Sequence, residues 1–556
     1  MAWRVSGLAG GSIESDRRNE FLRVTLLVLA GAALYTWHTA PTVRFWDAAE
    51  RALVARELGV SHPAGCILHA VFGKAFLTIV PLAPDYAANL LSAVAAALAL
   101  GVSYGIGRRF SDNRALCFGA TLVLATSALY WSQAIYSEVY ALHFLFFAVF
   151  MLFYVEWLAR GRSRDLAVAA FVYALGLGVH MSHILLAPWI LGGVLLKDRS
   201  LFRSPRRLLA VTGAMLLGLS WVAAVVIRGH SYWIIGTTER PDSLERLWAF
   251  LTGAQFAWAR HPPVALFAKR VIGSFVLLGY SFLGVGAVAA FAGWVTSLRR
   301  LAPLAFLAVG GTLSYILYFS DNSTSDVGTL ILPCCLFILL YLIIGGDRWA
   351  TSPARRRVVA VALPVLAAVQ AAVFPPLGRA AERAARDIAE AGFTLDEGPP
   401  AAFFWEGVLK AKVSWRNDWL PLGTAWKLAG QLDSVPGPKD FVAHWSLYTV
   451  LVFYQSSDGL LKDTRLYESI GQTRFYRPET GAEPERVCVW DVLNRKGEGR
   501  ALFFLCVERK PGLQQPHELV GRYWFDQTFY YLFRIDVDLG RERLDQPARH
   551  RNQPGL

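Results

Sequence analysis

The sequence predicts a mainly α, polytopic membrane protein of about eleven transmembrane helices, followed by a C-terminal α/β domain. Three observations lead to this fold class. Hydrophobic residues make up 54% of the 556 residues and the mean hydropathy is +0.37, values that are unlike those of a soluble protein. The apolar residues gather in runs long enough to span a bilayer. Clusters of arginine and lysine separate these runs, as in the cytoplasmic connections of membrane proteins.

The predicted spans follow from the rule that about 20 apolar residues cross the hydrocarbon core. They lie near residues 24–40, 86–107, 115–131, 138–157, 166–180, 181–196, 208–227, 271–294, 301–319, 329–345 and 358–374. Residues 166–196 could instead form a single long tilted helix. Their length favours two short helices that turn at Val179–His183.

The basic connections indicate the topology. If the helices alternate in direction, all of them lie on the side of the N-terminal tail, which the positive-inside rule makes cytoplasmic. The formal charge of +13 therefore reflects membrane topology, and no nucleic-acid partner is expected. The connections are Arg108/Arg109/Arg114, Arg160/Arg162/Arg164, Lys197–Arg207, Arg299/Arg300 and Arg348–Arg357.

These observations divide the chain into four parts. Residues 1–23 form a cytoplasmic tail, and residues 24–375 form the membrane domain, whose first span is read as a retained anchor. Residues 376–400 form a connecting amphipathic helix and linker. An odd number of spans places residues 401–556 outside the cytoplasm, which would be the periplasm for a protein of the plasma (inner) membrane.

Four segments are expected on the outer face. They are the loop 41–85, the turn 131–138, the loop 228–267 and the segment 320–326. The sequence of the first loop predicts two short helices, near 47–58 and 64–79. Gly59 and His62-Pro63 interrupt the helical pattern between them. Their apolar faces are typical of helices that lie along a membrane surface.

The C-terminal region reads as a compact water-soluble α/β domain. Phe441–Ala443 and Leu466-Tyr467 predict strands on either side of a helix at 446–456, and Val487–Leu493 with Ala501–Val507 predict a hairpin. Cys488 and Cys506 are equidistant from the hairpin turn. They would form a disulfide in an oxidising compartment or remain two half-buried thiols.

An unusual set of ionisable groups follows the first span. Arg44, Asp47, Glu50 and Arg51 are followed by His62 at a predicted membrane surface. A membrane face makes such groups costly unless they are solvated or paired. The stretch therefore predicts a catalytic site with Asp47 at its centre, on the far side of the membrane.

The motifs of the membrane part resemble those of the protein O-mannosyltransferase-like membrane proteins. The likeness is closer to the bacterial branch, long described only as a domain of unknown function and related to a vertebrate transmembrane O-mannosyltransferase. The resemblance covers much of residues 45–346 and is vaguer beyond them. It rests on Phe45–Glu50, Leu58–Gly65, Asn89–Ser92, Trp131–Ala134, Glu138–Leu142, Gly176–His180, Pro241–Leu247, Leu251–Gly253, Asp326 and Leu332-Pro333.

The resemblance implies a GT-C-type fold and a glycosyltransferase. Such an enzyme takes a sugar, for which the family suggests mannose, from a polyprenyl-phosphate carrier and transfers it outside the cytoplasm to a protein Ser/Thr or to an envelope glycan or lipid. Asp47 matches the essential acidic residue of the first outer loop in that superfamily. This chain has Asp-Ala-Ala-Glu at 47–50 where relatives commonly have Asp-Ser-Gly-Glu, and Val179-His180 where they commonly have Asn-His. The second departure removes a polar group beside His180.

The residue types fit that chemistry on their own terms. An inverting transfer from a phosphate-linked sugar needs one carboxylate to accept the proton of the attacking hydroxyl. We assign this role to Asp47, with Glu50 as the second catalytic candidate. Cations would stabilise the departing lipid phosphate. The candidates are Arg44, Arg51, Lys74, Arg240 and Arg246.

Each assignment has a structural alternative. Asp47 could cap the following helix, and Glu50 could be a partner of Arg51 or a first-turn match to the helix dipole. His62 could contact substrate or hold a turn beside Pro63.

The remaining candidates lie further along the chain. Glu138 could be a substrate contact or a polar end-group of a span, and Asp326 could support the site or end a loop. His180 could contact substrate; with His183 it could also bind metal, although a hydrogen-bonded structural role is favoured because no third ligand lies nearby.

The rival from another class is a transporter or lipid flippase. Transporters usually keep ionisable groups near the bilayer midplane, whereas the predicted spans are almost free of them. A catalytically dead relative is a third possibility. The expected partners are the lipid-linked sugar, the acceptor and the bilayer; no metal ligands or cofactor are assigned, and metal dependence stays open.

Overall fold

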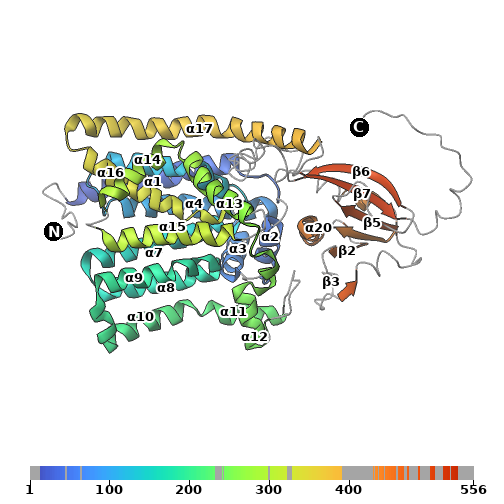
Figure 1. The fold of residues 1–556 in the computed structure, drawn as a ribbon. Coiled ribbons are helices and arrows are strands. Elements are labelled where there is room, and N and C mark those ends of the chain that lie inside the picture. Colours follow the sequence, from blue (N-terminus) through green and yellow to red (C-terminus); the bar gives the residue numbers. More distant parts are fainter. Residues whose placement is uncertain are drawn as a thin grey trace, which may run out of the picture. The chain divides into compact units, whose positions relative to one another are not determined.

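The computed structural model describes residues 13–43, 47–62, 66–231, 241, 243–297, 301–321 and 329–390, together with the C-terminal helix and strands named below and a few residues beside them. The chain forms two compact units. One consists of Met1–Arg44 and Val54–Asn417, and the other of Phe45–Leu53 and Asp418–Leu556. The first unit is a helical bundle, and the second contains the small sheets (Figure 1).

Seven helical stretches among the described residues are long and apolar enough to cross a membrane. Together they make a multi-pass membrane protein, and the predicted fold class is confirmed. They belong to α1 (Ile13–His38), α4 (Pro84–Gly107), α7 (Val139–Arg160), α10 with α11 (Pro205–Gly218 and Trp221–Ser231), α13 (Val264–Ser281), α15 (Ala302–Ser320) and α17 (Pro353–Glu390).

The predicted count of eleven spans is not confirmed, because several predicted segments form shorter or broken helices. These are α5 (Arg114–Ala125) with α6 (Ala128–Gln133), α8 (Ser163–Val179), η1 (Met181–Leu186) with α9 (Ala187–Lys197), α14 (Val285–Ser297) and α16 (Cys334–Trp349). The predicted span 271–294 breaks between α13 and α14, where Leu283 and Gly284 have φ angles of 51° and 69°. A left-handed backbone conformation ends an α-helix.

Residues 166–196 form two helical segments, as their length predicted. α8 ends at Val179, and η1 begins at Met181. His180 between them has an extended backbone (φ −155°, ψ 125°), and its side chain accepts a hydrogen bond from Ser182 N. The histidine therefore caps the second segment.

The core of the bundle lies around α7, which packs against α4 and α8. Its inward-facing aromatic rings Phe144, Phe147, Phe150 and Tyr154 are fully buried. Neighbouring rings along this row lie 5.6–6.4 Å apart, in edge or stacked contact. Such pairs give a membrane bundle close packing where the hydrophobic effect between helices is weak.

Ion pairs join several basic connections at one end of the bundle. Glu20 of α1 pairs with Arg108 and with Arg114, at N–O distances of 3.4 and 2.6 Å. Glu156 near the end of α7 pairs with Arg109 and Arg160. These clusters therefore lie beside the start of α1, as the alternation of helices predicted.

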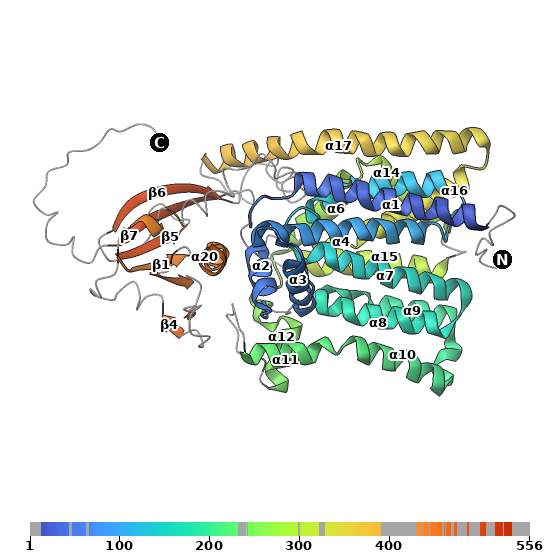
Figure 2. The same ribbon diagram turned by 180° about the vertical axis from the view of Figure 1, so that it is seen from behind.

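Short helices occupy the opposite end of the bundle. Figures 1 and 2 show α3 (Ile67–Ile79) and α12 (Leu244–Thr252) at the end away from the start of α1. The predicted surface helices near 47–58 and 64–79 correspond to α2 (Asp47–Glu57) and α3. The remaining short elements are η2 (Arg199–Arg203) and η3 (Ala254–Ala259).

The C-terminal region contains a five-stranded mixed sheet of order β2-β1-β5-β7-β6. β1 pairs in parallel with β2 and β5, while β7 pairs antiparallel with β5 and β6. The strands are β1 (Lys439–Ala443), β2 (Thr464–Glu468), β5 (Ala501–Cys506), β6 (His517–Phe525) and β7 (Thr528–Ile535). α20 (Trp445–Asp458) connects β1 to β2, which confirms the predicted strand–helix–strand unit.

The predicted hairpin of 487–493 with 501–507 is wrong. β4 (Arg486–Cys488) pairs with β3 (Gln472–Arg474) in a separate two-stranded sheet, whereas β5 pairs with β1 and β7. Cys488 therefore lies opposite Gln472, and Cys506 opposite Tyr531. The hairpin argument for a disulfide fails, and the two cysteine side chains lie outside the described residues.

Candidate functional site

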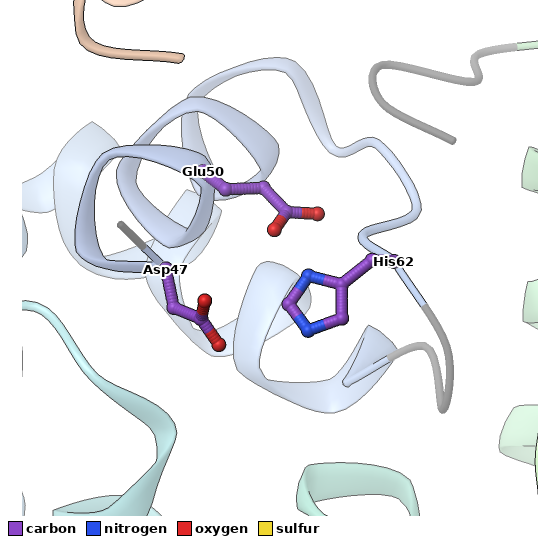
Figure 3. A group of neighbouring side chains, drawn as sticks. All are labelled: Asp47, Glu50 and His62. Atoms are coloured by element: carbon purple, nitrogen blue, oxygen red, sulfur yellow. The ribbon is translucent and has the colours of Figure 1, made fainter. Parts of the chain in front are cut away.

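Three predicted site residues lie together at α2 and in the loop that follows it. Figure 3 shows the carboxylates of Asp47 and Glu50 and the imidazole of His62 directed toward one another, and one ligand atom from each lies within 4.8 Å of the others. Asp47 and Glu50 occupy the first turn of α2, where negative charge complements the helix dipole.

Arg51 lies one helical turn after Asp47. Its Nη2 donates to Asp47 Oδ2 over 3.3 Å. The arginine side chain is 3% exposed, whereas the aspartate side chain is 23% exposed. The carboxylate is therefore held from the protein side by a buried cation and remains accessible to a second molecule.

The C-terminal end of α2 is anchored by cations from other elements. Arg228 at the end of α11 donates from Nε to Leu58 O over 2.8 Å and from Nη2 to Glu57 O over 3.3 Å. Lys74 of α3 donates to Arg56 O over 2.7 Å. These cationic side chains donate hydrogen bonds to carbonyl groups that have no partner within the helix at its C-terminal end.

Asn89 of α4 joins two of the predicted outer segments. Its Nδ2 donates to Ala40 O and Thr42 O, each over 2.9 Å, and its Oδ1 accepts from Ser137 N over 2.8 Å. The side chain is fully buried. It therefore fixes the residues before α2 against the turn that precedes α7.

Glu138 ends that turn and caps α7. Its Oε2 accepts from Val139 N over 3.4 Å, and its own N–H donates to Ser92 Oγ over 3.4 Å. Ser92 Oγ also lies 3.2 Å from Glu138 O. The residue is 7% exposed and lies at the start of α7, as the predicted polar end-group of a span would. A contact with substrate stays a prediction.

His180 lies in a group of rings between α7 and α8. Its ring centroid is 5.6 Å from that of Tyr140 and 5.5 Å from that of His143. His180 Nδ1 lies 2.8 Å from Ser182 Oγ. His183 is fully buried beside His143, with ring centroids 4.2 Å apart. His180 thus has the hydrogen bond expected of a structural histidine, whereas His183 is buried among rings; a contact of His180 with substrate stays a prediction.

The other predicted outer segments also meet near this end of the bundle. His62 contacts Phe256 of η3 with ring centroids 6.0 Å apart. Asp321, which follows α15, lies 3.4 Å from His261 and 3.9 Å from Arg260. Contacts therefore connect the first loop with the later one, and the later loop with the end of α15.

Three predicted substrate-binding residues, Arg44, Arg240 and Asp326, lie outside the described residues. Arg246 is exposed on α12. Sequence reasoning gave no site role to Asn89, Ser92 or Arg228. A polar side chain within the apolar 86–107 run was the available signal for Asn89, and a lone arginine at the end of the 208–227 run was the signal for Arg228.

The donor set at α2 also fits a divalent cation. Two carboxylate oxygens and an imidazole nitrogen are ligands that Zn²⁺ and Mn²⁺ accept. Within the described parts of the chain, Asp47, Glu50 and His62 are the one group of three or more such ligands close enough to hold an ion.

Comparison with known proteins finds relatives of the first part of the membrane domain. Residues 47–202 match the family model of the protein O-mannosyl-transferase TMEM260 N-terminal domain. The mouse protein O-mannosyl-transferase TMEM260 is 32% identical over 212 residues, which cover 36% of this chain and 30% of the mouse protein. The match thus spans less than a third of that relative's length.

Solved structures of ArnT from Cupriavidus metallidurans share the fold. The structure bound to undecaprenyl phosphate has a TM-score of 0.57 at 16% identity and covers 94% of this chain and 98% of that one. The apo structure has a TM-score of 0.58 at the same identity and coverage. The resemblance to the protein O-mannosyltransferase-like membrane proteins is therefore confirmed for the part of the chain that matches TMEM260, and the chain has an ArnT-like fold.

Proposed function

We propose that this protein is an integral-membrane glycosyltransferase that moves a sugar from a polyprenyl phosphate to a hydroxyl group on the extracytoplasmic face. The observation that carries the proposal is the partly exposed Asp47 carboxylate, paired with buried Arg51 on a helix at the start of the TMEM260-like region. The ArnT structure with undecaprenyl phosphate supports a lipid-phosphate carrier for the donor. The name of TMEM260, a protein O-mannosyl-transferase, supports mannose as the transferred sugar and a protein hydroxyl as the acceptor.

The proposed reaction uses the negative charge of the Asp47 carboxylate. Asp47 accepts the proton of the acceptor hydroxyl as its oxygen attacks the anomeric carbon of the sugar. The bond from that carbon to the phosphate oxygen breaks on the opposite face, and the lipid phosphate leaves with the bonding electron pair. The anomeric configuration inverts, because attack and departure occur on opposite faces.

The neighbouring residues divide the remaining tasks. Arg51 holds the Asp47 carboxylate in one orientation, and a fixed orientation of the reacting group lowers the barrier. Glu50 and His62 border the same space and would contact the acceptor or the sugar hydroxyls. Arg44 and Arg240 are the proposed partners of the leaving phosphate, with His180, Glu138 and Asp326 as further substrate contacts.

The test uses purified protein in lipid nanodiscs with a polyprenyl-phosphate sugar and a hydroxyl acceptor, either a Ser/Thr peptide or an envelope glycolipid. We expect a new glycosidic bond of inverted configuration, detected by mass spectrometry and NMR. Asp47→Asn should lower the rate by about 10²- to 10⁴-fold. A transporter or flippase would move the lipid-linked sugar across the bilayer without forming this bond.

The matched control is Asp85→Asn. Asp85 is another acidic residue in the first turn of a helix, α4, and lies outside the proposed site. Its substitution should leave the transfer rate unchanged. Normal transfer by folded Asp47→Asn protein would remove the assignment of the base. Mass spectrometry of envelope proteins and glycolipids from cells with and without the chain would then identify the acceptor and the sugar.

A further inference from the structure

Two membrane segments of the bundle are interrupted next to each other. α5 ends at Ala125 and α6 begins at Ala128, while α13 ends at Ser281 and α14 begins at Val285. α13 also contacts α6. A break inside a membrane leaves backbone N–H and C=O groups that must find partners within the protein.

A glutamine of α17 provides partners at both breaks. Gln370 is fully buried. Its Nε2 donates to Ser281 O over 3.1 Å, and its Oε1 lies 2.7 Å from the Thr126 hydroxyl. Thr126 is the residue that follows α5. One side chain therefore connects the end of α5 with the end of α13.

The hydroxyl of Ser281 extends this network into α6. It accepts from Leu129 N over 3.3 Å and donates to Leu277 O over 2.7 Å. Leu129 lies in the first turn of α6, where amide groups have no partner within their own helix. The start of α6 is thus bonded to α13, and α13 to α17.

α6 leads directly into the turn at 134–138, which carries Glu138. In this turn Ile135 O accepts from Ala40 N over 2.8 Å, and Ser137 N donates to Asn89. The turn is therefore hydrogen-bonded to the segment that leads from α1 to α2. A shift of α6 would displace both the turn and this segment.

We propose that Gln370 is a positioning residue for the transfer reaction. By joining the two helix breaks it fixes α6, and through α6 it fixes the turn with Glu138 and the segment before α2. The link to catalysis rests on the proposed function, whereas the link from Gln370 to the turn does not.

The experiment compares Gln370→Leu with the native protein in nanodiscs. Leucine is similar in size and removes both hydrogen bonds of the amide. We expect kcat to fall about tenfold or more, because small displacements near the chemistry are costly, while KM for the lipid-linked donor changes less than about twofold. Hydrogen exchange of residues 128–138 should accelerate about tenfold, while α4 and α8 keep their protection.

The matched control is Val369→Leu, because Val369 lies beside Gln370 on α17 and is 44% exposed. Its kinetics and exchange should be those of the native protein. Ser281→Ala is a second test, which changes the side-chain volume little and removes the hydrogen-bond acceptor of the Leu129 amide. It should also lower kcat and accelerate the exchange of residues 128–138, and it serves as the test if Gln370→Leu does not fold.

Three results would overturn the proposal. They are unchanged exchange at 128–138, accelerated exchange in all helices alike, and accelerated exchange at 128–138 with an unchanged kcat. If the native protein transfers no sugar, the proposed function fails; the exchange measurement then still decides whether Gln370 fixes the turn.

Discussion

The guanidinium of Arg51 lies 3.3 Å from the carboxylate of Asp47, four residues earlier on α2. The pair joins a buried cation to a partly exposed anion. The arginine side chain is only 3% exposed, so the surrounding protein holds its charge in place beside the carboxylate. We therefore assign to this pair the orientation of the Asp47 carboxylate, which would be lost with the arginine.

Arg51→Gln should lower the transfer rate about ten- to hundredfold. The reason is that a hydrogen bond to a charged group contributes about 1.5–3 kcal/mol, and each 1.36 kcal/mol changes a rate about tenfold. Steady-state kinetics in nanodiscs would measure the loss. Arg56→Gln is the control, since Arg56 lies in the last turn of the same helix and pairs with Glu57. Equal rates for both variants would contradict the orienting role.

Zn²⁺ should inhibit transfer, and a chelator should leave the metal-free rate unchanged. Asp47, Glu50 and His62 offer three ligand atoms within 4.8 Å of one another. A metal ion at this position would occupy the carboxylate oxygen that the reaction needs as a base. Initial rates measured against Zn²⁺ concentration would show the inhibition.

His62→Ala should raise the inhibitory Zn²⁺ concentration by at least about tenfold, because even residues outside the ligand shell change metal affinity that much. His261→Ala is the control, as His261 is 86% exposed and pairs with Asp321. Loss of activity on chelation would instead mean that the metal takes part in the reaction.

Asn89→Leu should destabilise the folded protein by about 3 kcal/mol or more. The substitution removes three hydrogen bonds of a fully buried side chain and leaves their backbone partners unsatisfied. Reversible denaturation in mixed micelles would measure it. Asn113→Leu removes one capping bond at α5 and should cost about 1 kcal/mol. A smaller loss for Asn89→Leu than for Asn113→Leu would refute the bridging role.

The local part of the candidate site was predictable from the sequence. Asp47, Glu50 and His62 lie within 16 residues of chain, and helix α2 with the following turn is sufficient to bring them together. Turn residues and charged first turns are local signals. For the same reason α2 and α3 were predicted close to their observed bounds.

The long-range part was not predictable. Arg228 reaches α2 across 170 residues, and Thr126 reaches Gln370 across 244. Hydrophobic periodicity identifies which segments are buried but not which polar side chains meet. The same limit explains the wrong hairpin. The alternation of apolar and polar residues identified β5 as a strand but did not show that it pairs with β1 and β7.

The topology gives the last prediction. Ion pairs place the 108–114 connection beside Glu20 near the start of α1, and the positive-inside rule predicts that this end is cytoplasmic. A reporter fused after residue 110 should therefore be active in the cytoplasm, and one fused after residue 400 in the periplasm. Fluorescent-protein and phosphatase fusions distinguish the two sides. A fusion after Gly161, which follows Arg160 of the paired Glu156 cluster, should match the one after residue 110. If the fusions after 110 and 400 report the same side, the number of crossings between them is even, and the proposed placement of the C-terminal domain is excluded.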